Sequence, residues 1–399
     1  MLFSLHALSF PRRRVGPIAV DFGCDSLKLL QLSSDEPTRV IAAAAAVVPG
    51  TARRDMGARQ AFVAQTLPRL LASQPFQGRR VICSLPAFQS IVQHMEVPAV
   101  EDEDGLELQV QLQLRERMDV DPDRMVVRYF PIAQVTREGQ PMQDVLCLAA
   151  GRDVVMRHIE LLSRMKLNVV GMHSEAMAIQ AAFANAAPTP EQATCFIDIG
   201  ATTTKVVILQ NGEIAFAKTI QVAGDELTQQ YATREHMDFE QARLRRIEQA
   251  GAEVSQPVGA AGPRAAVGTG LPSLDAQAGV TSVAGATGVA AEAVADAAAV
   301  AEGDAIETLI DELQMGLRYH RRLFPGCPVG KLVFLGGEAH QSSLCQQIAR
   351  NLQVAAQRGD PLASVHERAG VKPTAGVDLG EPQPGWAVPY GLAISQPNL

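Results

Sequence analysis

Hydrophobic residues along the chain gather into short apolar runs separated by turns that contain glycine. Residues 16–32 predict an apolar strand, a turn around Gly23 and a second apolar strand. Residues 194–209 repeat this plan around Gly200. In both copies Asp, Gly and Lys occupy the first, third and eighth positions, and the copies lie 177 residues apart (198 minus 21). The repeat predicts a pair of related α/β lobes that face each other across a cleft.

Further segments predict the elements around these two copies. Residues 81–98 resemble a pair of strands, and residues 144–167 predict a strand followed by a helix. Residues 331–352 predict a strand, a Gly-Gly turn and a helix. Residues 105–117 fit both a half-buried strand and one face of a helix, and their content of Gln, Glu, Leu and Arg favours the helix.

The composition changes sharply between residues 251 and 303, where Ala, Gly, Val, Ser and Pro dominate. Few large side chains remain there, so burial cannot offset the entropy of ordering the segment. We expect a disordered insertion within a domain, because an apolar helical pattern resumes at Asp304. The expected organisation is a flexible tail (1–14), a first lobe (15–190) and a second lobe (191–399).

Length and charge narrow the functional classes. A chain of 399 residues exceeds what one core usually organises, and a formal charge of -8 argues against broad contact with nucleic acid. The residues Arg12, Arg13 and Arg14 follow an apolar stretch too short to span a membrane. They fit either a disordered tail or contact with an anionic membrane surface. No secretory signal pattern is evident, so we expect a cytoplasmic protein.

The two repeated turns carry residues suited to phosphate. Glycine lets backbone amides approach phosphate oxygens without a Cβ clash, and hydroxyl groups add donors. A nucleotide-bound Mg²⁺ keeps several waters and commonly needs only one or two protein carboxylates, held directly or through those waters. The predicted phosphate residues are Gly23, Ser26, Gly200, Thr202 and Thr203, and the predicted metal carboxylates are Asp21 and Asp198.

Three further positions have two readings each. Lys28 and Lys205 lie five residues beyond the turn glycines, where they either reach a phosphate or remain solvated. The pair Gly336 and Gly337 follows an apolar strand, where bare backbone would let an adenine or its ribose lie close. The alternative is an ordinary tight turn between a strand and a helix.

The order of these elements resembles the superfamily of actin, hexokinase and the heat-shock chaperone ATPases. Within it the chain is similar to the PilM family, the actin-like proteins of type IV pilus assembly, which are related to the cell-division protein FtsA. The resemblance runs from about residue 16 to residue 395, apart from the insertion. Its motifs are VICSLPAFQSIVQHMEVP and the acidic helix after it, DVLCLAAGRDVVMRHIELLSRMKLNVVGMHSEAMAIQAAF, FIDIGATTTKVVIL, VAGDELTQQ, the GGEA turn and VPYGLAIS.

The resemblance implies an actin-like (ribonuclease H-like) two-lobed α/β fold with a nucleotide cleft between the lobes. It also implies an extra subdomain of the FtsA and PilM type at about residues 96–165. ATP and Mg²⁺ are the implied cofactors. Gly224 and Asp225 match the loop near the ribose and phosphates, and Glu175 falls where related ATPases orient the attacking water. The alternative for Glu175 is a helix-capping or surface residue. The residues that would bind nucleotide are Asp21, Gly23, Ser26, Lys28, Asp198, Gly200, Thr202, Thr203, Lys205, Gly224, Asp225, Gly336 and Gly337.

The chain departs from the family pattern at three places. Cys24 and Asp25 replace small Ser-rich residues, and Asp25 adds negative charge near a polyanion unless it points away. Arginines dominate the helix near the adenosine, which leaves Glu240 and Arg246 as weaker candidates. The insertion falls in the lobe where actin relatives make longitudinal contacts, which argues against filaments like those of actin.

The function implied by the resemblance is a cytoplasmic, ATP-binding scaffold of type IV pilus assembly or a related secretion or competence system. It would dock the cytoplasmic amino-terminal peptide of a PilN-like inner-membrane protein, contact other assembly components and reach the inner face of the inner membrane through that partner. The alternatives are a small-molecule kinase, for which no D-x-G-G substrate loop is present, and an FtsA-like protein, whose amphipathic carboxy-terminal helix is not evident. ATP hydrolysis, at most weak, and homo-oligomer formation stay open.

Overall fold

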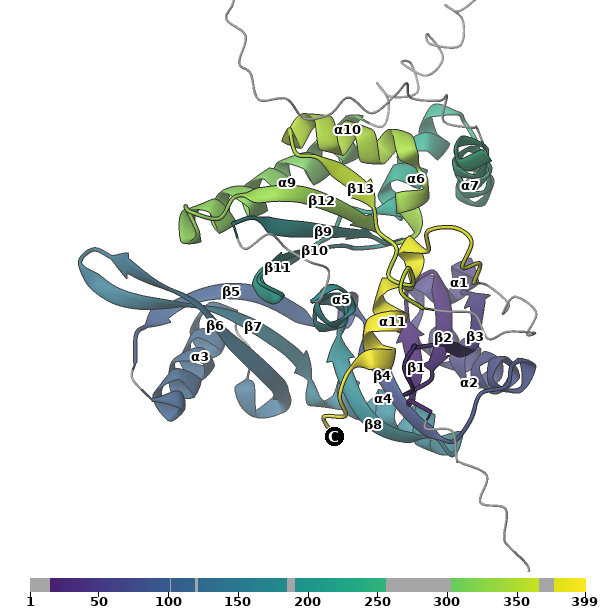
Figure 1. Cartoon of the computed structure of the whole chain (residues 1–399), viewed down its shortest axis with the longest axis horizontal. Coiled ribbons are helices and arrows are strands. Elements are labelled where there is room, and N and C mark those ends of the chain that lie inside the picture. The colour runs from purple at the N-terminus through teal and green to yellow at the C-terminus, as the bar shows by residue number, and fades with distance from the viewer. Residues whose placement is uncertain (1–14, 101, 119–120, 185–190, 256–302, 366–376) are drawn as a thin grey trace, which may run out of the picture.

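The computed structural model describes residues 15–100, 102–118, 121–184, 191–255, 303–365 and 377–399. The expected tail at residues 1–14 and nearly all of the expected insertion, residues 256–302, lie outside these ranges. Two five-stranded sheets and one three-stranded sheet make up the molecule (Figure 1). We call the first five-stranded sheet with the helices on its outer face the first lobe, and the second such sheet with its own helices the second lobe.

The first five-stranded sheet has the order β3-β2-β1-β4-β8. Its first three strands are antiparallel, whereas β4 and β8 run parallel to β1. Every residue of β1 is buried, as expected for a central strand that is covered on both faces. The strands are β1 (Ile18–Phe22), β2 (Ser26–Leu32), β3 (Val40–Val47), β4 (Arg80–Leu85) and β8 (Asn168–Ser174).

The second five-stranded sheet repeats this topology, with the order β11-β10-β9-β12-β13. Again the first three strands are antiparallel and the last two are parallel to the central strand. The duplicated sequence plan is therefore confirmed as a duplicated sheet. The strands are β9 (Ala193–Ile199), β10 (Thr204–Gln210), β11 (Glu213–Ile220), β12 (Val329–Leu335) and β13 (Ala356–Arg358).

Two helices lie between the five-stranded sheets and join them into one core (Figure 1). These helices are α5 (Glu175–Phe183) and α11 (Ala387–Ile394). They cross so closely that a Cβ on Gly391 would overlap the carbonyl oxygen of Ala178. Apolar side chains from the inner faces of both sheets pack around them, including Leu30 of β2 and Val207 of β10.

Other helices cover the outer faces of the two sheets. On the first sheet α2 and α4 bury Leu67 and Leu162 against β1 and β4. On the second sheet α9 and α10 bury Leu309 and Ile348, and α6 packs beside α7. The bounds are α1 (Gly50–Arg54), α2 (Met56–Ser73), α4 (Arg152–Arg164), α6 (Gly224–Arg234), α7 (Phe239–Ser255), α9 (Gly303–Leu323) and α10 (Ser342–Leu352).

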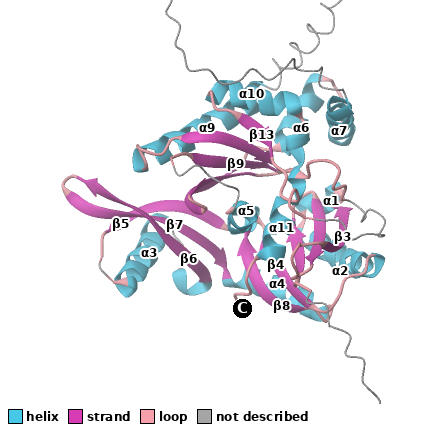
Figure 2. Cartoon of the chain, viewed as in Figure 1, coloured by secondary structure: helices cyan, strands magenta, loops and turns pink. Residues whose placement is uncertain are grey.

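A separate three-stranded antiparallel sheet of order β5-β7-β6 extends to one side (Figure 2). The ambiguous segment 105–117 is a helix, as its composition predicted, and it buries Leu106, Val110 and Leu114 against this sheet. A buried Asp144 pairs with His94 Nδ1 at 2.8 Å. The elements are β5 (Ile91–Pro98), α3 (Glu103–Met118), β6 (Met125–Arg137) and β7 (Gln140–Gly151).

His94 Nε2 also accepts a hydrogen bond from the Ala217 backbone of β11, which attaches the three-stranded sheet to the second lobe. The two strands predicted within residues 81–98 are both present, but β4 and β5 belong to different sheets. Four single-turn 3-10 helices complete the described chain: η1 (Ala87–Gln89), η2 (Pro122–Arg124), η3 (Gly337–His340) and η4 (Pro384–Trp386). Within the described ranges, no helix has the length and apolar character needed to cross a membrane.

Candidate functional site

The turns that link β1 to β2 and β9 to β10 face a common cavity of about 260 Å³ between the lobes. The Gly-Gly turn after β12 and the start of α6 close it from the second lobe. All thirteen residues that the sequence assigned to nucleotide binding line this cavity, and so does Glu175. Residues that are 177 positions apart in the chain thus meet at this cavity. The two sheets have the same topology, so the turns after β1 and β9 lie at the edges where the sheets face each other.

Glycine is required where these turns approach other backbone. A Cβ on Gly23 would lie 2.9 Å from the carbonyl oxygen of Ser26, closer than real Cβ contacts. Gly336 has a φ of 85°, and a side chain there would overlap Ile199 and Asp198. The chain passes from β12 through Gly336 and Gly337 and a 3-10 turn into α10. The predicted strand, turn and helix are thus confirmed.

Lys205 lines the cavity and lies between two carboxylates. Its Nζ is 3.0 Å from Asp198 Oδ2 and 2.9 Å from Glu175 Oε2. Burial by itself lowers the pKa of Lys205, but the Asp198 and Glu175 carboxylates outweigh it and raise that pKa above its ordinary value. Of the two readings of Lys205, the solvated one is wrong, since the residue is only 9% exposed. Lys28 donates to the carbonyl of Gly385 and lies 5.9 Å from the Trp386 ring centroid.

Glu175 begins α5, where the Ser174 hydroxyl caps the helix by accepting from Met177 N at 3.3 Å. The Glu175 side chain is buried, and its Oε1 accepts from the backbone N–H of Ala87 at 3.1 Å. Both carboxylate oxygens are thus engaged, one by Ala87 and the other by Lys205. The alternative of a surface glutamate is wrong.

Asp21 is buried at the end of β1 and accepts a hydrogen bond from the Ser84 hydroxyl at 3.0 Å. Burial, together with the nearby Glu175 carboxylate, raises the pKa of Asp21 to about 6. Without a nearby cation, an ionised Asp21 carboxylate therefore lowers the stability of the folded protein. A cation bound in the cavity would relieve this, so the position suits a metal-binding role.

The raised pKa predicts how stability depends on pH. Between about pH 4 and pH 6 the Asp21 carboxyl keeps its proton in the folded protein but loses it in the unfolded chain. The free energy of unfolding therefore falls as pH rises through this window. We expect Asp21→Asn to raise the free energy of unfolding at pH 7.5 by on the order of 2–3 kcal/mol. Urea denaturation at pH 7.5 and pH 4 measures this, and the gain should vanish at pH 4. A variant that is less stable than wild type at pH 7.5 would contradict the assignment.

Arg59 of α2 holds the first turn in shape. Its buried guanidinium donates to the carbonyl oxygens of Phe22 at 2.8 Å, Gly23 at 2.5 Å and Cys24 at 3.3 Å. These three bonds fix the conformation of the turn that lines the cavity. Arg59 is not predictable as a site residue from the sequence, because nothing in the local pattern of α2 marks it.

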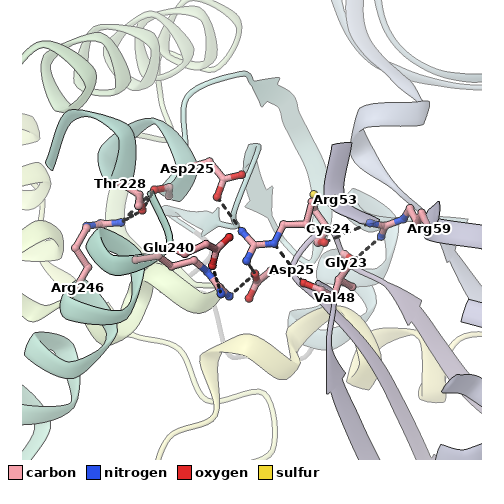
Figure 3. A network of polar contacts seen from close by, with 12 residues as sticks. Gly23, Cys24, Asp25, Val48, Arg53, Arg59, Asp225, Thr228, Glu240 and Arg246 are labelled. Atoms are coloured by element: carbon pink, nitrogen blue, oxygen red, sulfur yellow. Dashed lines mark hydrogen bonds and ion pairs between the residues drawn. The ribbon is translucent and has the colours of Figure 1, made fainter. Parts of the chain in front are cut away.

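Arg246 plays a similar part on the second lobe. Its guanidinium donates to Gly224 O at 3.1 Å and to the Thr228 hydroxyl at 2.8 Å (Figure 3). It also donates to Glu338 at 2.8 Å and to Gln341 at 3.0 Å, and so joins α6, α7 and the Gly-Gly turn. The sequence makes Arg246 only a weaker candidate for a position near the adenosine. Glu240, the second such candidate, lies on α7, 3.8 Å from Arg243.

Asp25 lines the cavity, and its carboxylate is paired with two arginines. Its Oδ1 lies 3.1 Å from Arg53 and 2.6 Å from Arg243 (Figure 3). The negative charge that the sequence placed near a polyanion is thus neutralised by two arginines. Cys24, the other departure, lines the cavity beside it.

The residues present fit a magnesium nucleotide. Residues of the two glycine turns, including the threonines of the second turn, line the cavity, and the carboxylates of Asp21 and Asp198 there are the hard oxygen ligands that Mg²⁺ prefers. Among the described residues there is no cluster of three or more metal-ligating side chains. A metal carried mainly by phosphates and water does not need such a cluster.

This chain resembles one protein family and several solved structures. Residues 19–256 match the family model described as "Type IV pilus assembly protein PilM". The solved structure titled "PilM-PilN type IV pilus biogenesis complex" is 21% identical, covers 96% of this chain and 98% of its own, and has a TM-score of 0.68. The ethanolamine utilization protein EutJ from Carboxydothermus hydrogenoformans is 11% identical (95% and 89% covered, TM-score 0.49). MreB5 of Spiroplasma citri bound to ADP is 14% identical (96% and 95% covered, TM-score 0.44).

The likeness to the first of these structures and the two sheets of matching topology confirm the α/β actin-like ATPase fold that the sequence predicted. The family model covers more than half of the chain, including both glycine turns and the three-stranded sheet. The chain therefore belongs to the PilM family of type IV pilus assembly proteins.

Proposed function

We propose that this protein is a nucleotide-binding scaffold of type IV pilus assembly. The observation that carries this proposal is the meeting of two glycine turns, the Gly336–Gly337 turn and the start of α6 around one cavity between the lobes. In this proposal the turn amides and the hydroxyls of Ser26, Thr202 and Thr203 hold the phosphates. Mg²⁺ bound through Asp21 and Asp198 neutralises part of the phosphate charge.

The same geometry supports slow hydrolysis at most. A general base must be available to take a proton from water, but Glu175 is held by Ala87 N and by the protonated Lys205. Its role in this proposal is to fix the Lys205 ammonium beside the phosphates. Nucleotide would act mainly by favouring the closed arrangement of the lobes, to the extent that it binds that arrangement more tightly.

We also propose that the protein docks the cytoplasmic tail of a PilN-like membrane protein and is thereby held at the inner face of the inner membrane. A structure of similar fold is titled as a PilM–PilN complex. A small cavity of about 20 Å³ lies where α2 and α4 meet η1, next to the start of β5. Two apolar side chains are exposed here: Met56, 43% exposed, lines this cavity, and Phe88 of η1, 38% exposed, lines the cavity between the lobes. They support an extended apolar peptide as the occupant.

This docking surface can be tested with one substitution. We expect Met56→Lys to weaken binding of a synthetic amino-terminal peptide from the PilN-like protein by about tenfold or more, because it places a charge in an apolar contact. Fluorescence anisotropy of the labelled peptide measures this. The matched control is Leu244→Lys on α7 of the second lobe, where the leucine is 57% exposed and does not line this cavity. Equal affinity of the Met56→Lys variant and wild type would remove this surface from the proposal.

A further inference from the structure

A chain of alternating charges joins the two lobes beside the cavity (Figure 3). It contains Asp225 of α6, Arg53 of α1, Asp25 of the first turn, and Arg243 and Glu240 of α7. Arg53 Nη1 lies 3.3 Å from Asp225 Oδ1, and Arg243 Nη2 lies 2.6 Å from Asp25 Oδ1. These two pairs cross between the lobes, because Arg53 and Asp25 belong to the first lobe and their partners to the second. We call these five residues the clasp.

The side chains of the clasp are buried to different degrees. The Arg53 side chain is 3% exposed and that of Arg243 is 16%, whereas Asp25 and Asp225 are 38% and 24% exposed. Exposed ion pairs contribute little, but pairs shielded from water and shared within a network interact more strongly. Arg53 is the central member, since it reaches both Asp225 and, at 3.1 Å, Asp25.

The clasp lies at the cavity that the proposed nucleotide would occupy. Asp25, Asp225 and Arg243 line that cavity, whereas Arg53 is not among the lining residues. The cavity volume of about 260 Å³ is slightly below the roughly 300–1,000 Å³ common for ligand pockets. Movement of the lobes apart to admit or release a nucleotide would stretch both cross-lobe pairs.

We propose that the clasp sets the rate at which nucleotide enters and leaves the cleft. This inference rests on the proposed nucleotide site. Opening of the cleft breaks the pairs Arg53–Asp225 and Asp25–Arg243, and closure restores them. Asp25, which by charge alone disfavours a polyanion, thus serves to hold the cleft shut. Salt weakens partly exposed ion pairs, so release accelerates with ionic strength.

The test replaces Arg53, the member that does not line the cavity. Release of a fluorescent ADP analogue is followed by stopped flow after mixing with excess ADP. We expect Arg53→Met, which keeps much of the side-chain volume, to release the analogue about tenfold faster than wild type, and Arg53→Lys to give an intermediate rate. Arg69→Met, at an exposed position on α2, is the matched control and should release at the wild-type rate.

A second measurement needs no nucleotide. Hydrogen exchange in the nucleotide-free protein should be faster in Arg53→Met than in wild type at the two turns, residues 22–26 and 200–203, because a loosened cleft exposes their amides. Unchanged exchange together with an unchanged release rate would overturn the clasp while leaving the nucleotide site intact. If wild type binds no nucleotide, the proposed function fails instead, and the exchange comparison alone decides whether the clasp holds the lobes together.

Discussion

Asp198→Ala is expected to lower the affinity for ATP in the presence of Mg²⁺ by about a hundredfold or more. The variant removes a cavity carboxylate that would hold the metal directly or through water, and metal-site partners of this kind typically contribute one to two orders of magnitude. The variant also removes one of the two carboxylates that pair with Lys205 and leaves Glu175 as the other. Isothermal titration calorimetry with ATP measures the effect.

Two controls separate a metal effect from a folding effect. The affinity for ATP measured in EDTA should change little in Asp198→Ala, since no metal is then bound. Asp35→Ala, at an exposed position between β2 and β3, should bind as wild type does. Unchanged Mg²⁺-dependent affinity in Asp198→Ala would refute the metal assignment.

Gly391→Ala is expected to lower the free energy of unfolding by about 2–3 kcal/mol, although alanine favours a helix over glycine by about 1 kcal/mol. The added Cβ would overlap the carbonyl oxygen of Ala178, so α11 must move away from α5. These helices form the layer between the two five-stranded sheets, and overpacking there disturbs both lobes. The midpoint of urea denaturation measures the loss.

The matched control is Gly326→Ala in the loop after α9, where a Cβ would meet nothing within 4 Å. That variant should unfold within about 0.5 kcal/mol of wild type. Equal stability of Gly391→Ala and wild type would show that the helix crossing tolerates a wider spacing than the structure has.

Much of the fold is predictable from the sequence because one strand-turn-strand pattern occurs twice along the chain. Apolar runs and a shared pattern of Asp, Gly and Lys marked β1, β2, β9 and β10, and the same pattern placed Asp21 and Asp198 at one cleft. These signals are local, since a strand end and a tight turn each depend on a few neighbouring residues. The resemblance to a family supplied Gly224, Asp225 and Glu175, which no local pattern identifies.

The contacts that depend on long-range geometry could not be predicted in this way. Nothing around Arg59 in α2 shows that its guanidinium reaches three carbonyls of the first turn. Asp25 appeared unfavourable because its partners, Arg53 and Arg243, come from α1 and from the other lobe. Lys205 likewise required a carboxylate from α5, 30 positions earlier (205 minus 175), before its burial made physical sense.

The most direct test of the central claim is a calorimetric titration of the purified wild-type protein with ATP and Mg²⁺. We expect saturable binding of one nucleotide per chain, weaker when Mg²⁺ is removed and about a hundredfold weaker in Asp198→Ala when Mg²⁺ is present. Absence of a binding signal from wild type at millimolar ATP, with the protein folded, would contradict a nucleotide cleft between the lobes.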